Sequence, residues 1–408
     1  MQRRLFAVSM CVALMVLALL PEPSSAAAPC QNTGSFERWL EKFKQDAAAE
    51  GISRRAIATA LDGMTFDPGV VARDRRQSFF AQSFLDFSQK LATQNRLQSG
   101  RQQIAKHRAI FDRAEREFGV PAPVIAAFWA LESDFGVGMG NLPVLRSLAT
   151  LAYDCRRSDM FRGELMDALR IIDRGDLTPG EMIGSWAGEL GQTQFLPGHY
   201  LKYAIDYDGD GKRNLMKSAA DVIGSSANFL AGLGWQRDQP WLEEVRVLSN
   251  LDWGQADLSI QHPRSHWAKL GITRPDGSPI ARDELPASLL LLMGRNGPAF
   301  LAYPNFQVYL KWNQSLNYAT TAAYLANRIA GAPPMSRGRG PVSALSGEQI
   351  KELQQLLIRL GLKEGEADGK LGAVTRAAVK AAQMKLGLPA DSYPTVELIE
   401  RLRAARNL

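Results

Sequence analysis

The most informative stretch of the chain reads Pro121-Ala-Pro-Val-Ile-Ala-Ala-Phe-Trp-Ala-Leu-Glu132-Ser-Asp-Phe-Gly136, which places a carboxylic acid in an apolar run. Helical spacing puts four of its side chains on one face, namely Ile125, Phe128, Glu132 and Phe135. Burial raises the pKa of a carboxyl group, and a carboxylic acid that is neutral at working pH can act as a general acid. The alternative for Glu132 is a buried structural ion pair.

The residues on both sides of this segment also predict helices. Residues 35–120 and 122–235 show helical periodicity broken by glycine-rich turns, and residues 317–330 return to it. Two short β-prone pieces, residues 244–248 and 306–310, predict a small strand element. The predicted fold class is therefore mainly α with a small β element.

The C-terminal part of the sequence predicts a separate helical unit. Residues 333–343 have linker composition, rich in Pro, Gly and Ser. In residues 344–408, two apolar sets at helical spacing predict amphipathic helices, the first Ile350, Leu353, Leu357 and Leu360, the second Val374, Ala377, Ala378 and Ala381. We expect a catalytic or binding domain over residues 29–332 and a small domain over residues 344–408.

Length and charge narrow the class of protein. The chain has 408 residues, 46% of them hydrophobic, with a net charge of +6 and a pI near 9.2. This charge favours polyanionic surroundings, which include nucleic acid, anionic lipid and cell-wall polymer. Because the basic residues are dispersed and form no nucleic-acid module, we expect no nucleic-acid partner.

The N-terminus predicts export. Arg3 and Arg4 precede an apolar run, Leu5–Leu20, and then a short Pro-, Ser- and Ala-rich stretch ends at Ala28. This pattern is typical of a secretory signal peptide, here residues 1–28, and we expect no transmembrane segment once it is removed.

Two cysteines remain in the predicted mature chain, Cys30 and Cys155. Disulfides persist in oxidising export compartments, so this pair predicts a bridge between the N-terminal segment and the main domain. The alternative is two buried free thiols.

An acidic loop offers oxygen ligands at the spacing of a calcium site. Asp206, Asp208 and Asp210 stand at positions one, three and five, with glycine at six, as in the first half of an EF-hand loop. Position twelve is Lys217, where a bidentate Glu is expected, although Asp221 could substitute in a longer loop. The site is therefore either a structural calcium site or a solvated Asp-Gly turn.

Residues 184–200 are dense in glycine, amide and aromatic groups. Amides and hydroxyls can hydrogen-bond sugar hydroxyls and acetamido groups, and aromatic rings offer flat apolar faces. A close-packed helix junction would have the same composition, so both interpretations stay open on composition alone.

Six of these segments together resemble lytic murein transglycosylases of the B type. They occur in the order of that family: residues 130–136, 153–157, 184–188, 191–197, 208–211 and 312–318. Residues 344–408 resemble the three-helix peptidoglycan-binding domain, with hallmarks at Leu353, Gln354, Leu357, Gly361, Asp368, Gly369, Gly372, Thr375 and Ala378.

The resemblance implies a fold, an activity and a site. The fold would be lysozyme-like and α-rich. The family cleaves the β-1,4 bond between N-acetylmuramic acid and N-acetylglucosamine and leaves a 1,6-anhydro ring on the muramic acid. Glu132 would be the single catalytic acid and then base, with substrate-binding residues at Ser185, Gln194, Arg156, Arg157, Trp312 and Tyr318. Trp312 stands where the family often has tyrosine, which keeps an aromatic surface and loses a hydroxyl.

A one-carboxylate site is chemically sufficient if the sugar supplies the nucleophile. Glycosidases that use water or a covalent intermediate need two carboxylates. The obvious second acid, Asp134, lies two positions after Glu132 and points to another side of a helix. The alternatives are a muramidase that uses water and a murein-binding scaffold without activity.

The expected partners follow from the same resemblance. We expect a monomeric, periplasmic enzyme that needs no cofactor beyond a structural calcium and binds peptidoglycan glycan strands. For residues 344–408, the alternative to wall binding is a helical dimerisation domain.

Overall fold

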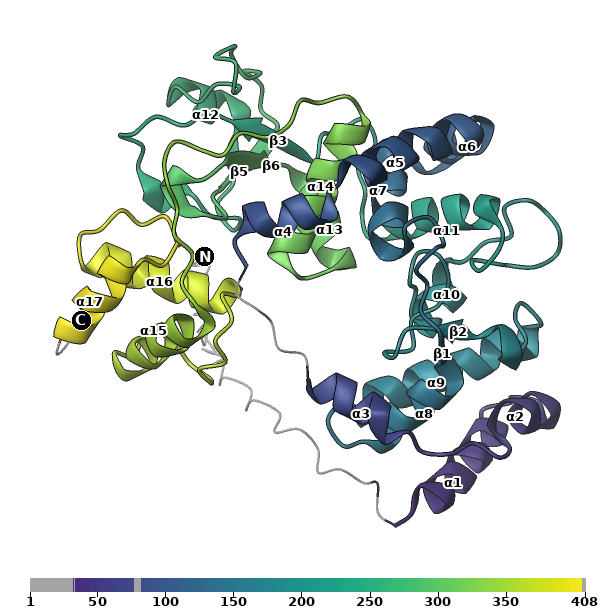
Figure 1. The fold of residues 1–408 in the computed structure, drawn as a ribbon. Helices are drawn as coiled ribbons and strands as arrows, with labels where there is room; N and C mark the ends of the chain where they lie inside the picture. The colour runs from purple at the N-terminus through teal and green to yellow at the C-terminus, as the bar shows by residue number, and fades with distance from the viewer. Residues whose placement is uncertain (1–31, 33, 77–81, 406–408) are drawn as a thin grey trace, which may run out of the picture.

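The structure is a computed structural model that describes residues 32, 34–76 and 82–405. It is mainly helical with small sheets, as predicted (Figure 1). In the described part of the chain, no helix has the length and apolar character needed to span a bilayer. The predicted signal peptide lies outside the described residues.

In its described residues, the large domain is built from fourteen α-helices and two small sheets. Before the central helix α7 (Ala122–Ser133) the chain forms α1 (Phe36–Ala49), α2 (Arg54–Leu61), α3 (Pro68–Arg75), α4 (Phe84–Leu91), α5 (Gln94–Lys106) and α6 (Arg108–Phe118). After it come α8 (Val144–Tyr153), α9 (Ser158–Arg174), α10 (Pro197–Tyr203), α11 (Ala219–Gly232), α12 (Arg264–Lys269), α13 (Pro304–Trp312) and α14 (Leu316–Ile329). A two-stranded sheet pairs β1 (Leu142–Pro143) with β2 (Ile183–Gly184).

Helix α7 is the core of this domain. It packs against α5 and α14, and its apolar side chains are buried all round rather than on one face, Ala126 and Trp129 included. The helix ends at Ser133 because Asp134 and Phe135 adopt left-handed backbone angles, with φ of 48° and 59°. The prediction that Phe135 continues the helical face of Glu132 was therefore wrong.

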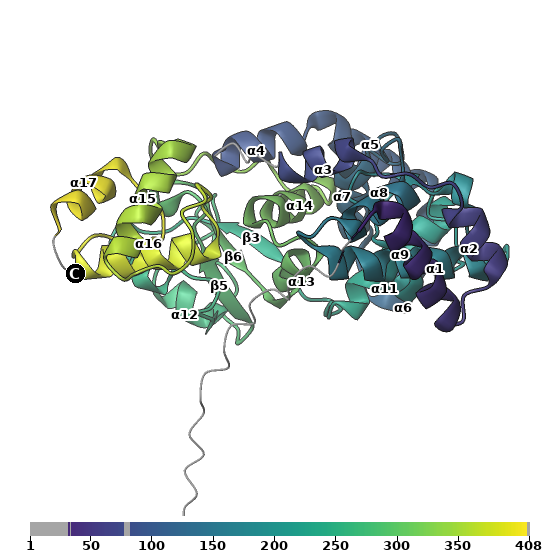
Figure 2. The ribbon, with the colours of Figure 1, turned by 90° about the horizontal axis from the view of Figure 1, so that it is seen from below.

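The strand element is an antiparallel sheet of order β3-β6-β5-β4, formed by β3 (Leu242–Val245), β4 (His262–Pro263), β5 (Pro286–Leu290) and β6 (Ala299–Ala302). The β-prone piece at 244–248 overlaps β3, but residues 306–310 lie in helix α13. Pro304 lies in the first turn of that helix, where proline is favoured. The side chains of Phe306 and Tyr309, on the same helix, are buried in the core. The helices α13 and α14 lie between this sheet and α7 (Figures 1 and 2).

The described part of the C-terminal domain consists of three helices: α15 (Gly347–Arg359), α16 (Ala373–Lys385) and α17 (Val396–Ala404). The predicted face of α15 is confirmed at Ile350, Leu353 and Leu357. The predicted face of α16 is confirmed at Ala378 and was wrong at Val374, which is 65% exposed. The buried set is Thr375, Ala378, Val379, Ala382 and Gln383. Alanines dominate this helix, so their spacing fits more than one face.

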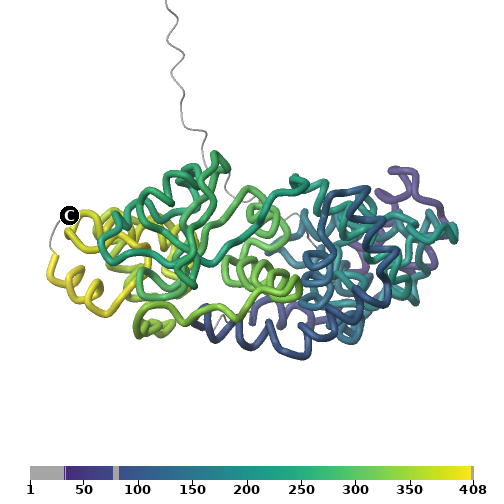
Figure 3. The backbone as a smooth tube through the Cα atoms, turned by 90° about the horizontal axis from the view of Figure 1, so that it is seen from above, coloured from purple at the N-terminus to yellow at the C-terminus, as the bar shows by residue number. Residues whose placement is uncertain are grey.

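The C-terminal domain is docked on the large domain. The guanidinium of Arg376 donates to the carbonyls of Leu291 (2.6 Å) and Leu292 (3.0 Å), and Lys380 forms an ion pair with Asp257. Arg339, in the predicted linker, donates to the Arg295 carbonyl at 2.9 Å. The docked molecule is elongated, with the C-terminal helices at one end and α1 and α2 at the other (Figures 2 and 3).

Cys155 is disulfide-bonded. The other half of the predicted bridge, Cys30, lies outside the described residues, so this pairing stays a prediction. The described residue Asn32 donates to the carbonyls of Ala152 (2.9 Å) and Tyr153 (2.7 Å), which anchors the start of the described chain beside α8.

Candidate active site

Glu132 lies one residue before the end of α7, and two other helices reach its carboxyl group. The Trp312 indole, from the end of α13, donates to Glu132 Oε1 at 2.8 Å. The Tyr318 hydroxyl, from the first turn of α14, donates to the same oxygen. Glu132 forms no ion pair in the described residues, so the alternative of a buried structural ion pair does not describe it.

The surroundings of Glu132 raise the pKa of its carboxyl group into the neutral range. Burial is the largest effect and raises the pKa of Glu132, and the charge of Glu189 raises it further. The two donated hydrogen bonds lower this pKa, and the net value is about 7. The side chain is half-buried and keeps a path to solvent. A carboxyl with a pKa near the working pH can both give and take a proton, which is what an acid and base catalyst must do.

Trp312 holds Glu132 rather than lying open as a flat sugar surface. Its ring stacks on Phe128 with the centroids 4.3 Å apart, and Phe229 and Phe195 also contact it. Tryptophan at this position lacks the hydroxyl of a tyrosine, as the sequence shows, but the position keeps a hydrogen-bonding role, because the indole N–H donates to the Glu132 carboxyl.

A tight hairpin carries Ser185. Backbone bridges join Gly184 to Leu190 and Leu190 to Phe195, so the segment folds back beside the end of α7. The Ser185 hydroxyl accepts from the backbone N–H groups of Ala187 (3.1 Å) and Glu189 (3.2 Å), and donates to the Glu189 carboxylate at 2.9 Å. Ser185 therefore organises this turn, and its proton is directed at Glu189.

Glu189 is a site residue that the sequence prediction missed. It is half-buried, burial raises its pKa, and its charge acts on both Glu132 and Tyr318. Glu189 is therefore a second acid whose charge acts on Glu132, in addition to Asp134. The signal was present in the sequence as a glutamate among the glycines and amides of residues 184–200.

Gln194 closes the hairpin against the loop that follows α7. Its amide donates to the carbonyls of Gly191 (2.8 Å) and Met139 (3.2 Å), and its backbone is left-handed, with φ of 51°. The neighbouring Gln192 accepts from the Trp129 indole at 2.9 Å, and its carbonyl accepts from Ser133 at 2.5 Å. These contacts fix the hairpin to the end of α7 that carries Glu132.

Asp134 is held away from this chemistry. Arg96 on α5 binds it through two contacts of 2.5 and 2.9 Å, and that guanidinium holds the pKa of Asp134 below its usual range. Asp134 is thus an ionised structural partner, in agreement with the prediction that it does not assist Glu132.

Arg156 and Arg157 converge on a different acid. Both donate to Asp74, near the end of α3, and Asp74 is only 1% exposed. Arg157 also lies over the ring of Phe161. This arrangement gives both arginines a structural partner; their predicted contact with substrate stays a prediction.

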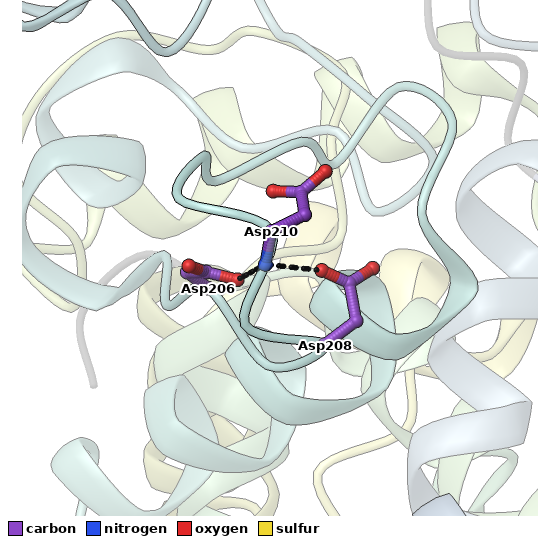
Figure 4. A group of neighbouring side chains, drawn as sticks. All are labelled: Asp206, Asp208 and Asp210. Atoms are coloured by element: carbon purple, nitrogen blue, oxygen red, sulfur yellow. Dashed lines mark hydrogen bonds between the residues drawn. The ribbon is translucent and has the colours of Figure 1, made fainter.

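The three acids of the predicted calcium loop lie together. Their carboxylate oxygens fall within 4.8 Å of one another, and Asp206 and Asp208 flank the backbone nitrogen of Asp210 (Figure 4). Asp221 accepts from the backbone N–H groups of Tyr207 (2.7 Å) and Asn214 (2.6 Å), which closes the base of the loop. An oxygen-only donor set of this kind suits a hard cation such as calcium.

Comparison with known proteins gives the family. The model of the Transglycosylase SLT domain matches residues 35–327, and that of the putative peptidoglycan binding domain matches residues 346–402. The membrane-bound lytic murein transglycosylase B of Escherichia coli (strain K12) is 30% identical over 254 residues, which are 61% of this chain and 68% of that protein.

Two solved structures extend the similarity to the fold. The crystal structure of SltB3 from Pseudomonas aeruginosa in complex with NAG-anhNAM-pentapeptide has a TM-score of 0.85 and 39% identity, and the match covers 91% of this chain and 100% of that chain. The Escherichia coli lytic transglycosylase Slt35 in complex with calcium has a TM-score of 0.61 and 28% identity, over 74% of this chain and 94% of that chain. The chain described here belongs to the lytic transglycosylases with an SLT domain, and it also carries a peptidoglycan-binding domain.

Proposed function

We propose that this enzyme cleaves the β-1,4 bond between N-acetylmuramic acid and N-acetylglucosamine in peptidoglycan and forms 1,6-anhydromuramic acid. The observation that carries the proposal is a half-buried Glu132 whose pKa is about 7, with both donated hydrogen bonds on Oε1. No described residue donates to Oε2 in the structure, which leaves that oxygen for the substrate.

The reaction needs one carboxyl group that acts twice. Protonated Glu132 gives its proton to the glycosidic oxygen, and the bond from that oxygen to the anomeric carbon of muramic acid breaks. The acetamido group of muramic acid stabilises the electron-poor carbon. The Glu132 carboxylate then takes the proton of the muramic acid 6-hydroxyl as its oxygen bonds to the anomeric carbon, so Glu132 is restored and no water is consumed.

A muramidase that uses water is the second candidate, and Glu189 favours it. A hydrolase needs a second carboxylate to activate water or to form a covalent intermediate, and Glu189 is the acid whose charge reaches Glu132. The two candidates leave different products, because an anhydro end carries one water fewer than a reducing end.

Product analysis of digested sacculi decides between them. We expect mass spectrometry to find anhydro-muropeptides from the wild-type enzyme and a loss of about 100- to 10,000-fold in their rate of release by Glu132→Gln, the usual contribution of a general acid and base. Reducing-end products from the wild type would point to the muramidase, and wild-type rates from Glu132→Gln would remove Glu132 from the mechanism.

For the C-terminal domain and the location of the enzyme, we propose wall binding in the periplasm. The family match over residues 346–402 supports wall binding, and the apolar N-terminal run supports export. Sacculi should retain the full chain more strongly than a chain that ends at residue 343. Equal retention, or a dimer in sedimentation that depends on residues 344–408, would favour the dimerisation alternative.

We also propose that Asp206, Asp208 and Asp210 hold a structural calcium. The support is three carboxylates on one loop, with the Asp206 oxygens already turned toward the loop backbone. Calcium should raise the thermal midpoint of the wild type and leave that of Asp208→Asn unchanged. A calcium-independent midpoint in the wild type would identify the loop as a self-bonded turn.

A further inference from the structure

We propose that a cavity between the four-stranded sheet and the linker binds the terminal carboxylate of a peptidoglycan stem peptide, through the guanidinium groups of Arg246 and Arg339. The proposal rests on the proposed function, because it adds a second contact with the same polymer. None of the residues that line this cavity takes part in the cleavage at Glu132.

The cavity has a volume of about 240 Å³ and lies where the linker crosses the ends of β3 and β6 (Figure 1). Its apolar floor includes the buried side chains of Val245, Val247 and Ala299. Its polar lining consists of Arg246, Ser336 and Arg339. Among the described residues, no aspartate or glutamate lines it, so the cavity is apolar below and positively charged at its mouth.

The linker wall of the cavity is held in place by backbone contacts. Gly338 has a φ of 89°, and a Cβ there would lie 2.2 Å from the Asn296 carbonyl oxygen. The Arg339 N–H donates to that same carbonyl at 2.7 Å, and the Ser336 N–H donates to the Glu244 carboxylate at 2.8 Å. Because the cavity exists before a ligand arrives, binding does not have to order the linker first.

Arg339 is fixed in position and still has donors to spare. Its Nε and Nη2 groups donate to the Arg295 carbonyl at 3.2 and 2.9 Å, and Nη1 lies 3.4 Å from the Val247 carbonyl. A guanidinium carries five N–H donors, so these contacts do not use all of them. The guanidinium also lies over the Trp253 ring, 5.3 Å from its centroid.

The charge of Arg339 is not balanced by an acid in the described residues. Its partners are carbonyl groups, and burial together with the positive charge of Arg295 lowers the pKa of Arg339. The acid beside Arg295 is Asp391, which pairs with Arg295 itself. An anion in the cavity would therefore meet a cation that lacks a counter-charge.

Arg246 brings a second guanidinium to the same cavity. Its backbone pairs with that of Thr273, where the Arg246 N–H donates at 2.8 Å, and this fixes the point from which the side chain extends. The exposed guanidinium forms no hydrogen bond or ion pair with any described residue. Two guanidiniums at one cavity suit a carboxylate, because their planar forks match its two oxygens.

The size of the cavity selects an end group rather than a sugar chain. Sites for whole small molecules usually measure about 300–1,000 Å³, and this cavity is smaller. It can take a carboxylate on the arginines and a small apolar side chain on the floor. Peptidoglycan offers this combination at the free ends of its stem peptides, whereas an inorganic phosphate would leave the apolar floor unused.

The test is isothermal titration calorimetry of an isolated stem pentapeptide with the full chain. The peptide has no glycosidic bond, so binding is measured without cleavage. We expect Arg246→Gln to weaken the affinity by roughly 10- to 100-fold, the usual effect of losing charge-assisted hydrogen bonds. The same peptide with an amidated C-terminus should bind the wild type as weakly as the free peptide binds Arg246→Gln, and inorganic phosphate should bind more weakly than the free peptide.

The matched control is Arg337→Gln. Arg337 is an exposed arginine of the same linker and does not line the cavity, so its substitution removes an equal charge beside the site. Its affinity for the peptide should equal that of the wild type. Arg246→Lys keeps the charge and loses the planar fork, so its affinity should fall between those of the wild type and Arg246→Gln.

The outcomes separate this inference from the proposed function. Equal affinity of the wild type and Arg246→Gln, or of the free and amidated peptides, would overturn the inference. Phosphate that binds as tightly as the peptide would also overturn it and identify a general anion site. If Arg246→Gln does not fold by circular dichroism, Arg246→Lys and the amidated peptide carry the test. A wild type that binds the peptide but releases no anhydro product would overturn the proposed function alone.

Discussion

At the scale of single residues, the proton of Glu132 is controlled by groups that act in opposite directions. Burial and Glu189 raise its pKa, whereas the hydrogen bonds from Tyr318 and Trp312 lower it. Trp312→Phe keeps the ring that stacks on Phe128 and removes only the N–H donor. The alkaline limb of kcat/KM should therefore move to higher pH.

Tyr309→Phe is the control for Trp312→Phe. Tyr309 also stacks on Phe128, at 5.0 Å, and its buried hydroxyl has no hydrogen-bond partner in the described residues. Its pH profile should equal that of the wild type. A downward shift in Trp312→Phe would mean that the indole does not stabilise the carboxylate.

The raised pKa of Glu132 also predicts a cost in stability. A carboxyl whose pKa is 4.5 unfolded and about 7 folded favours folding below pH 4.5, and this contribution is lost as pH rises through 7. Glu132→Gln should therefore be more stable than the wild type at pH 8, by up to about 3 kcal/mol, and similar to it at pH 4. Urea unfolding at both pH values measures this, and an equal difference at both would show that ionisation is not its cause.

At the scale of elements, the loop between α7 and β1 packs directly on the hairpin that begins at Gly184. Gly140 has a φ of 91°, and a Cβ there would lie 2.2 Å from the Gly184 carbonyl oxygen. Gly140→Ala should push the hairpin with Ser185 and Glu189 away from Glu132. We expect a loss of about 2 kcal/mol in the free energy of unfolding and a fall in kcat at all pH values.

Gly138→Ala in the same loop is the matched control. The nearest atom to its Cβ would be the Ser133 carbonyl oxygen at 3.7 Å, an ordinary contact, and its φ is not positive. Thermal unfolding and kcat should both remain close to wild type. Equal damage from the two substitutions would show that the loop tolerates no side chain anywhere, and would remove the argument for Gly140.

The elements that sequence periodicity predicted are those whose apolar residues differ clearly from their neighbours. Helices α14 and α15 were found this way, but α13 was taken for a strand because Phe306, Val308 and Tyr309 favour strands as strongly as they fill a core. Glu132 could be predicted because a carboxylate contradicts the apolar run around it. Glu189 could not, because its electrostatic effect on Glu132 depends on a hairpin whose closure no local pattern reveals.

At the scale of the whole molecule, the C-terminal domain is a docked part of the enzyme. Composition predicted a linker, and the structure adds that the linker is fixed: Arg339 donates to the Arg295 carbonyl, and Arg295 in turn pairs with Asp391 of the C-terminal domain. Asp391 is 4% exposed and also accepts the Arg295 N–H at 2.9 Å. If the domain binds the wall as proposed, docking would present the polymer to the enzyme in one orientation, whereas a free tether would raise only its local concentration.

Arg376→Met tests this docking. The guanidinium donates to the Leu291 and Leu292 carbonyls, and its loss would leave both without that donor at the domain interface. We expect about 2 kcal/mol of interface stability to be lost. Small-angle X-ray scattering should then show a larger radius of gyration, and thermal unfolding should separate into two transitions.

The control is Arg403→Met in the same domain. The Arg403 side chain is 57% exposed and pairs with Glu352 on α15, so its loss should cost less than about 1 kcal/mol. If Arg376→Met kept the compact scattering profile and a single transition, the interface would have to be held by Asp257 and Asp391 without this arginine.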